Sequence, residues 1–234
     1  MISKDFICID KDISVASTMP SFFYTDIDLY KKTLDKIFNY SWQFVSDKKS
    51  ISKYKTIPIL FLQDSINEPL ILSNNDNIEC ISNVCTHRAN ILCDKPSNKN
   101  SIQCGYHGRT FDLSGKFKFM PGFEDAKNFP SNEDNLKQAN IKLWKDFIFC
   151  SLNNGININD ILEDIDTRLI NFPFQNLGLD NDNSSEYVID AHWATYCENY
   201  LEGFHVPYVH SGLNNDINVD TYETILFKNS IKKG

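Results

Sequence analysis

Apolar residues recur with a helical period near the start of the chain and with a strand-like pattern in its middle. Between Asp26 and Trp42 they recur mainly every three or four residues, which predicts one amphipathic helix. From Ile51 to about Phe149 the apolar residues form short runs, often β-branched or aromatic, separated by clusters of Asn, Asp, Ser and Pro. This middle block predicts antiparallel β structure.

Within this block, residues Thr110 to Phe119 predict a β-hairpin. Two alternating segments flank Ser114-Gly115. Glycine can adopt the positive φ that a tight hairpin requires.

The chain after Cys150 predicts a separate region. An Asn-rich stretch begins at Asn153, where we place a domain boundary, and a short helix is expected around Asp160 to Leu169. Residues Glu186 to Asp190 are typical of a strand, and Trp193 to Phe204 carry aromatic residues at four-residue spacing, which predicts a helix. The expected regions are residues 1–45, 46–152 and 153–234.

The composition is that of a folded protein and excludes several classes of partner. Of the 234 residues 41% are hydrophobic and 23% charged, an ordinary globular composition. The formal net charge of -8 predicts no large basic surface, so neither nucleic acid nor an anionic membrane is an expected partner. The longest apolar run, Ile57 to Leu62, is far shorter than the roughly 20 residues that span a bilayer. The N-terminus has neither the features of a secretory leader nor a twin arginine, so a cytoplasmic location is expected.

The seven cysteines indicate metal or cluster ligation rather than a disulfide framework, because their number is odd and the chain is long enough to fold without disulfides. Four candidate ligands form two short pairs, Cys85-Thr86-His87 and Cys104-Gly105-Tyr106-His107, both expected on loops. Two such loops facing each other can hold a cluster in which one iron takes two thiolates and the other takes two imidazoles. This is the ligand set of a Rieske [2Fe-2S] centre.

The spacing alone leaves two alternatives open: a zinc site with two cysteines and two histidines, or four unrelated residues. Coincidence is disfavoured because the chain has only five histidines, and two of them stand at a ligand-like offset from a cysteine. The remaining cysteines belong to no such pair and are expected to be ordinary, mostly buried thiols. They are Cys8, Cys80, Cys93, Cys150 and Cys197.

At these residues the sequence resembles the Rieske domain of ring-hydroxylating oxygenase large subunits. The resemblance rests on the two ligand pairs and on the hairpin from Phe111 to Gly115, and the segment from Met19 to Trp42 is similar to the family's N-terminal region. Ala89 stands where the family usually has glycine, and Arg109 where it usually has tryptophan. The four ligand positions are intact.

A second group of candidate ligands lies between Glu198 and His210. His205 and His210 would stand about 140° apart on a straight helix, so Pro207 is expected to bend or end the helix between them. Two imidazoles and one carboxylate on one face of iron are the ligands of a non-haem Fe(II) centre that activates O₂. The run resembles the start of the oxygenase family's catalytic domain. The resemblance implies that His205 and His210 bind iron and that Glu202 bridges to the Rieske centre of a neighbouring subunit, the alternative for Glu202 being a solvated helix charge.

The third iron ligand is the open question of this region. In the resembling family the carboxylate comes from a helix much further along the chain, whereas this sequence ends at Gly234. Asp216, Asp220 and Glu223 are near in sequence, but no pattern selects one of them. The sequence is therefore expected to be either a fragment or a protein that has lost the mononuclear site. His192 has no motif around it and is expected to be structural.

The resemblance implies an α+β fold, in which an antiparallel β Rieske domain (46–152) precedes the start of a truncated helix-grip catalytic domain (153–234). A ferredoxin or a flavin-dependent reductase would reduce the [2Fe-2S] cluster. A mononuclear Fe(II) would then activate O₂ to hydroxylate or demethylate a small organic substrate, either an aromatic compound or a quaternary amine. A homo-oligomer is implied, by resemblance a trimer. The alternatives are a Rieske electron-transfer protein without oxygenase activity and, third, a zinc-binding structural module.

Overall fold

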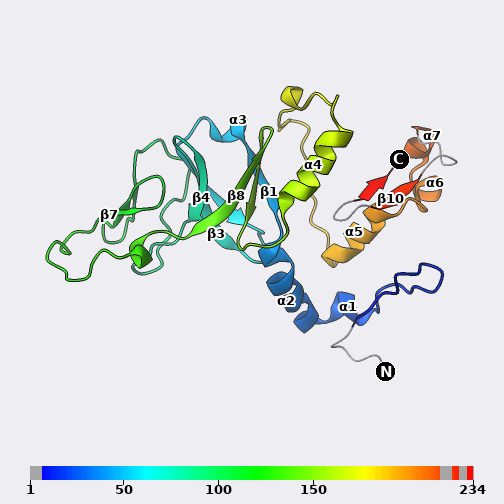
Figure 1. Cartoon of the computed structure of the whole chain (residues 1–234), viewed down its shortest axis with the longest axis horizontal. Helices are drawn as coiled ribbons and strands as arrows, with labels where there is room; N and C mark the ends of the chain where they lie inside the picture. Colours follow the sequence, from blue (N-terminus) through cyan, green and yellow to red (C-terminus); the bar gives the residue numbers. More distant parts are fainter. Residues whose placement is uncertain (1–6, 217–222, 227–230, 234) are drawn as a thin grey trace. The chain divides into compact units, whose positions relative to one another are not determined.

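The structure, a computed structural model, describes residues 7–216, 223–226 and 231–233 of the chain (Figure 1). These residues form two compact units. The β unit comprises residues 34–158 and 165–179, and the helical unit comprises the described parts of residues 1–33, 159–164 and 180–234.

A six-stranded antiparallel sheet forms the frame of the β unit (Figure 1). In chain order its strands are β1 (Gln43–Asp47), β2 (Thr56–Phe61), β3 (Glu68–Asn74), β4 (Ile78–Ser82), β8 (Gln138–Trp144) and β9 (Phe147–Ser151). They lie side by side in the order β1-β9-β8-β4-β3-β2. Each neighbouring pair is antiparallel, so the antiparallel β block expected from Ile51 to about Phe149 is confirmed.

Strands β3 and β4 supply side chains to two hydrophobic cores. Leu72 pairs with Cys80 and Ile71 pairs with Ile81, and successive residues of a strand point to opposite faces. Leu72 and Cys80 pack in one core, whereas Ile71 and Ile81 pack in the other, together with the two candidate cysteine ligands. The candidate ligands therefore lie on a core that shares its strands with the main sheet.

A three-stranded antiparallel sheet carries the predicted hairpin. Its strands are β5 (Ile102–Gln103), β6 (Thr110–Phe111) and β7 (Phe117–Phe119), in that order. Strands β6 and β7 pair, which confirms the hairpin expected from Thr110 to Phe119. At its turn Gly115 has a φ of +81°, and the Asp112 carboxylate accepts hydrogen bonds from the backbone N–H groups of Ser114 and Lys116, both at 3.0 Å.

Short helices complete the β unit and its connections. They are η1 (Phe38–Tyr40), α3 (Lys48–Ile51), η2 (Asn132–Asp134), α4 (Ile158–Arg168) and η3 (Phe174–Asn176). Helix α4 confirms the helix expected around Asp160 to Leu169. The helix expected from Asp26 to Trp42 is shorter than predicted, because α2 (Ile27–Lys36) ends before Trp42. The indole N–H of Trp42 instead donates to the Ile156 carbonyl at 2.9 Å, where the chain turns into β1.

The helical unit contains short helices and one strand pair. Its elements are α1 (Phe22–Thr25), most of α2, α5 (Trp193–Leu201), α6 (Val206–Val209), α7 (Ser211–Asp216), β10 (Thr224–Leu226) and β11 (Ile231–Lys233). His192 precedes α5 as its N-cap, and its Nδ1 accepts a hydrogen bond from the Ala194 N–H at 3.3 Å. The rings of Phe23 and Tyr24 pack edge-on against the imidazole. His192 thus has the structural position that was expected.

Two predictions for the helical unit are wrong. Residues Glu186 to Asp190 form no strand, since no strand in the described part of the chain pairs with them, and Val188 is 96% exposed. Helix α5 ends at Leu201 and not at Phe204, because Glu202 adopts an extended backbone with φ -122° and ψ 158°.

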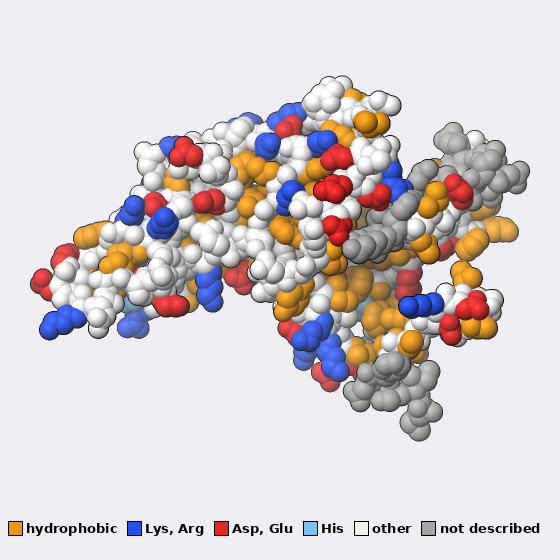
Figure 2. All heavy atoms as spheres, in the orientation of Figure 1, with side chains coloured by type: hydrophobic (Ala, Val, Ile, Leu, Met, Phe, Trp, Pro, Cys, Tyr) orange, Lys and Arg blue, Asp and Glu red, His pale blue; other side chains and the backbone are white. Residues whose placement is uncertain are grey.

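Charged side chains of both signs are interspersed on the face of the molecule that Figure 2 shows. Acidic side chains gather over α4, and the described residues on this face form no continuous basic surface. Within the described ranges, no helix combines the length and the apolar character that crossing a membrane requires.

Candidate functional site

The first candidate ligand pair lies on a tight loop that follows β4. The Cys85 N–H donates to the Asn90 carbonyl at 2.9 Å, and the Ala89 N–H donates to the Cys85 carbonyl at 3.0 Å. To close this loop, Ala89 takes a left-handed backbone with φ +52°. Such a conformation is unusual for a residue that carries a Cβ.

The second loop, which follows β5, repeats the same backbone hydrogen bonds. The Cys104 N–H donates to the Arg109 carbonyl at 2.8 Å, and the Gly108 N–H donates to the Cys104 carbonyl at 3.0 Å. Gly108, four residues after its cysteine as Ala89 is after Cys85, has φ +74°. The two loops therefore present their cysteines in equivalent positions and differ in where the histidine follows.

The two loops bring like side chains together. The thiols of Cys85 and Cys104 lie close enough to influence each other's pKa, and the two residues are only 3% and 2% exposed. The rings of His87 and His107 lie with their centroids 4.8 Å apart, His87 half-buried and His107 exposed. The sequence spacing could not establish this sorting of sulfur with sulfur and nitrogen with nitrogen.

This sorting of donors matches the ligand arrangement of a two-iron cluster. A Rieske cluster takes two sulfur donors on one iron and two nitrogen donors on the other.

Hydrogen-bond donors around the Cys104 sulfur favour its thiolate form. Burial alone would raise the pKa of Cys104, but the backbone N–H groups of Tyr106 and His107 and the side chain of Asn90 hold its pKa below the ordinary value. The Asn90 Nδ2 group donates to the Cys104 sulfur at 3.6 Å. Burial raises the pKa of the neighbouring Cys85. Donors to sulfur of this kind also tune the reduction potential of iron–sulfur clusters.

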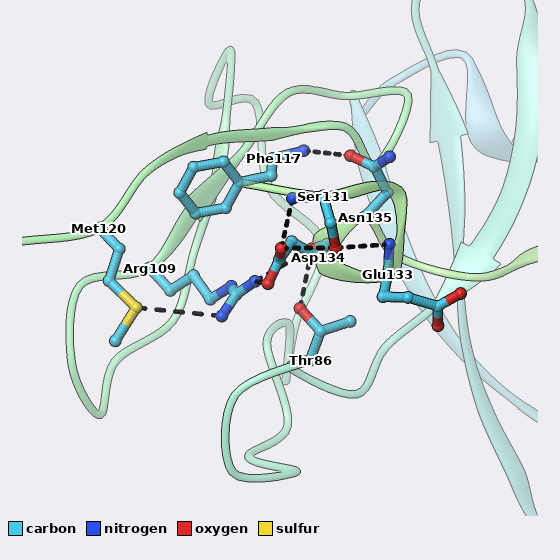
Figure 3. A network of polar contacts seen from close by, with 8 residues as sticks. All are labelled: Thr86, Arg109, Phe117, Met120, Ser131, Glu133, Asp134 and Asn135. Carbon is cyan, nitrogen blue, oxygen red and sulfur yellow. Dashed lines mark hydrogen bonds and ion pairs between the residues drawn. The ribbon is translucent and has the colours of Figure 1, made fainter. Parts of the chain in front are cut away.

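A buried ion pair lies beside both ligand loops (Figure 3). The Arg109 guanidinium donates to the Asp134 carboxylate at 2.5 Å, and Thr86 donates its hydroxyl to the Asp134 backbone carbonyl at 2.9 Å. Burial would raise the pKa of Asp134, but hydrogen bonds from Ser131 and Arg109 hold it below the ordinary value. Sequence reasoning missed Asp134. The available signal was the spacing Ser131-x-x-Asp134, which forms a capping box at η2.

The second group of candidate ligands brings its two histidines together. The rings of His205 and His210 have centroids 5.2 Å apart, and His205 Nδ1 contacts the Glu202 carboxylate. The predicted role of Pro207 is wrong. The helix breaks earlier, after Leu201, and Pro207 lies in the first turn of α6, where the missing N–H has no partner to lose. Glu202 therefore reaches His205 across a helix break and not along one helix face.

A third iron ligand is not identified in the described part of the chain. Asp216 is the last residue of α7, Asp220 lies outside the described residues, and Glu223 is exposed. No described carboxylate joins the two histidines in a group that could hold a metal.

A family model with the description Rieske [2Fe-2S] domain matches residues 41–130, which include both ligand loops and the hairpin. This match confirms the resemblance of these residues to a Rieske [2Fe-2S] domain.

Curated relatives extend the similarity beyond the Rieske domain. Choline monooxygenase of Arabidopsis thaliana is 31% identical over 224 residues, which are 91% of this chain and 53% of the relative. The carnitine monooxygenase oxygenase subunit of Escherichia coli K12 is 25% identical over 88% of this chain and 56% of the relative. The resemblance to Rieske oxygenase large subunits is confirmed, and the chain spans about half the length of the curated relatives it matches.

Solved structures show the same fold. The quaternary ammonium Rieske monooxygenase CntA in complex with L-carnitine has a TM-score of 0.77 at 23% identity, over 93% of this chain and 62% of that structure. A naphthalene 1,2-dioxygenase structure with indole bound has a TM-score of 0.63 at 23% identity, over 82% and 45% of the two chains. The predicted fold class, an antiparallel β Rieske domain followed by the start of a further domain, is confirmed.

Both departures of this Rieske domain from the family pattern have a physical account. Ala89 keeps the left-handed backbone that a glycine would take without strain, so the loop geometry is preserved. Arg109 is 3% exposed, and its guanidinium carbon lies 5.0 Å from the ring centre of Phe117. A cation thus fills the position where the family usually has an aromatic ring.

Proposed function

We propose that this chain is the electron-receiving part of a Rieske oxygenase of the cytoplasm. In this proposal Cys85 and Cys104 hold one iron of a [2Fe-2S] cluster, and His87 and His107 hold the other. The observation that carries the proposal is how two loops with the same backbone hydrogen bonds arrange their donors. The two buried thiols lie together, and the two more exposed imidazoles lie together. The proposed domains are an N-terminal segment (1–45), the Rieske domain (46–152) and part of a catalytic domain (153–234).

The sulfur ligands and the nitrogen ligands of the proposed cluster lie in different surroundings. The buried sulfurs receive N–H donors, which would stabilise the negative charge of the two thiolates that hold one iron. His107 is exposed and would be the ligand that an electron donor or acceptor can approach from solvent. The bound cluster supplies one-electron chemistry, and the electron donor would be a ferredoxin or a flavin-dependent reductase.

At the second site we propose that His205 and His210 bind mononuclear Fe(II), which supplies O₂ activation when it is bound. Glu202 is the positioning residue there. A hydrogen bond from His205 lowers the pKa of Glu202, so the carboxylate is charged at neutral pH and can hold the proton on Nδ1. This leaves Nε2 of His205 free for the metal. By resemblance, Glu202 also bridges to His107 of a neighbouring copy in a homo-oligomer, a trimer in the family.

The substrate class proposed is a small organic molecule with a quaternary ammonium group, hydroxylated or demethylated with O₂. The support is that the relatives named choline and carnitine monooxygenase match about nine-tenths of this chain, and that CntA has a higher TM-score than the naphthalene dioxygenase. An aromatic substrate is the weaker candidate.

A second candidate function is a Rieske electron-transfer protein that lacks oxygenase activity. This function needs only the cluster ligands, whose donors the structure sorts on two loops. Substrate-dependent O₂ consumption with a reductase and choline or carnitine separates the two functions. The oxygenase consumes O₂ only with substrate present, whereas the carrier does not.

The cluster itself is tested by anaerobic purification, iron and acid-labile sulfide analysis, and electron paramagnetic resonance of the reduced protein. We expect two acid-labile sulfides per chain and a Rieske spectrum, both lost in Cys104→Ser, with two irons in the cluster and any further iron assigned to the second site. Cys197→Ser is the matched control, because this thiol is exposed and lies in no ligand pair. A colourless protein with one zinc per chain would contradict the proposal.

A further inference from the structure

The ion pair Arg109–Asp134, with a buried guanidinium and a half-buried carboxylate, lies beside the proposed cluster site. The side chains are only 4% and 20% exposed, and the Arg109 Nε atom is buried without a hydrogen-bond partner. Replacing a buried ion pair by apolar side chains of similar volume is often neutral or stabilising. Stability alone therefore does not account for a charged pair at this position.

Among the described residues, the guanidinium of Arg109 lies between aromatic rings and pairs with the Asp134 carboxylate. Its carbon lies 5.8, 5.0 and 5.5 Å from the ring centres of Phe111, Phe117 and Phe129. Asp134 provides both a carboxylate oxygen at 2.5 Å and its backbone carbonyl at 3.3 Å. A planar, fork-shaped cation held between rings and a carboxylate has one orientation, which a flexible ammonium group would not have.

Asp134 is contacted from both ligand loops, as Figure 3 shows. From the loop of Cys85, the Thr86 hydroxyl donates to the Asp134 carbonyl at 2.9 Å. From the loop of Cys104, Arg109 holds the Asp134 side chain, while the Arg109 backbone carbonyl closes that loop on the Cys104 N–H at 2.8 Å. Thr86 and Arg109 each stand within two residues of a candidate histidine ligand, so the pair joins the segments that carry His87 and His107.

We propose that Arg109 and Asp134 are a positioning pair that fixes the His87 loop against the His107 loop and so sets the geometry of the nitrogen-bound iron. This inference rests on the proposed function, because it assigns the two imidazoles to one iron. Desolvation of the ion pair costs folding free energy, but the pair holds the two loops in a single arrangement. Its loss loosens the imidazole side of the cluster while the two thiol ligands and the main sheet stay in place.

The experiment compares variants of the 234-residue chain for cluster signature and cluster lifetime. In Arg109→Met and in Asp134→Asn we expect circular dichroism of the fold to be retained, the paramagnetic resonance lines of the reduced cluster to shift and broaden, and the cluster to be lost in air about tenfold faster or more, the change that about 1.4 kcal/mol produces. Arg109→Lys, which keeps the charge but not the fork, should give an intermediate result. The control is Lys118→Met, which breaks an exposed ion pair with Asp112 in the same hairpin.

The outcomes separate this inference from the proposed function. A wild-type protein that shows no Rieske signal refutes the proposed function before any variant is made. A normal wild-type signal that is unchanged in Asp134→Asn and Arg109→Lys, with unchanged cluster lifetime, overturns the positioning role. If Arg109→Met does not fold, those two conservative variants still decide the matter, since they preserve side-chain volume and most of the packing.

Discussion

Ala89 has a strained left-handed backbone, whereas glycine, which takes this conformation without strain, stands at the equivalent position 108 of the second loop. Removing the strain at Ala89 should stabilise the β unit. A left-handed backbone costs a residue with a Cβ about 1–2 kcal/mol, and Ala89 has φ +52°. Glycine gains about 0.5–1 kcal/mol of extra freedom in the unfolded chain. The Ala89 methyl group is exposed, so its removal loses little burial. The difference predicts that Ala89→Gly raises the free energy of unfolding by roughly 0.5–1 kcal/mol.

The assay is urea unfolding of the cluster-loaded protein without oxygen, followed by circular dichroism and by the visible absorption of the cluster. The reverse variant, Gly108→Ala, should lower the free energy of unfolding, because Gly108 has φ +74° and a Cβ there would lie 3.2 Å from a Pro121 side-chain carbon. The control is Ala126→Gly. Ala126 is exposed and does not have a left-handed backbone, so this variant should be slightly less stable than wild type. If Ala89→Gly is no more stable than wild type while Ala126→Gly behaves as expected, the strain argument is refuted.

Two further predictions concern carboxylates. Burial would raise the pKa of Asp112, but hydrogen bonds from Ser114, Lys116 and Lys118 hold it below its ordinary value of 3.8. Asp112 therefore stabilises the fold fully above pH 3.8, and this contribution disappears as the pH falls through the lowered pKa. Asp112→Asn should therefore cost about 1 kcal/mol at pH 7 and less near pH 2, measured by unfolding at both pH values; an equal cost at both would contradict the assignment. In a form of this protein extended to the full length of its relatives, the proposed function predicts that Glu202→Gln leaves the cluster spectrum unchanged but slows cluster oxidation in single-turnover experiments with substrate and O₂. An unchanged rate would make Glu202 a surface charge.

The candidate ligands were accessible from sequence because metal chemistry demands particular residue types at short spacing. Two pairs of a thiolate and an imidazole, two or three residues apart, predict a metal or cluster site, and Gly115 with its neighbours predicts the hairpin that follows. The sorting of Cys85 with Cys104 and of His87 with His107 was not encoded locally, since it depends on how two loops face each other. The structure supplied that step.

The wrong or missing predictions for residues 186–190, Pro207 and Asp134 have one cause: tertiary contacts decide which secondary structure or contact a local sequence pattern forms. The alternation from Glu186 to Asp190 suits a strand, but a strand also needs a partner. Pro207 can end a helix or begin one, and here the extended backbone at Glu202 had already ended it. Asp134 was missed because its contact with Arg109 joins residues 25 positions apart and is set by packing in the fold.

The sharing of β3 and β4 between two cores limits how this region can change. Because Ile71 and Leu72 are neighbours that serve opposite cores, inserting or deleting one residue in β3 would exchange the side chains offered to each. The metal-bearing core and the main sheet would then fail together. Changes of length are therefore confined to the loops, and variation inside the strands must proceed by substitution with side chains of similar volume.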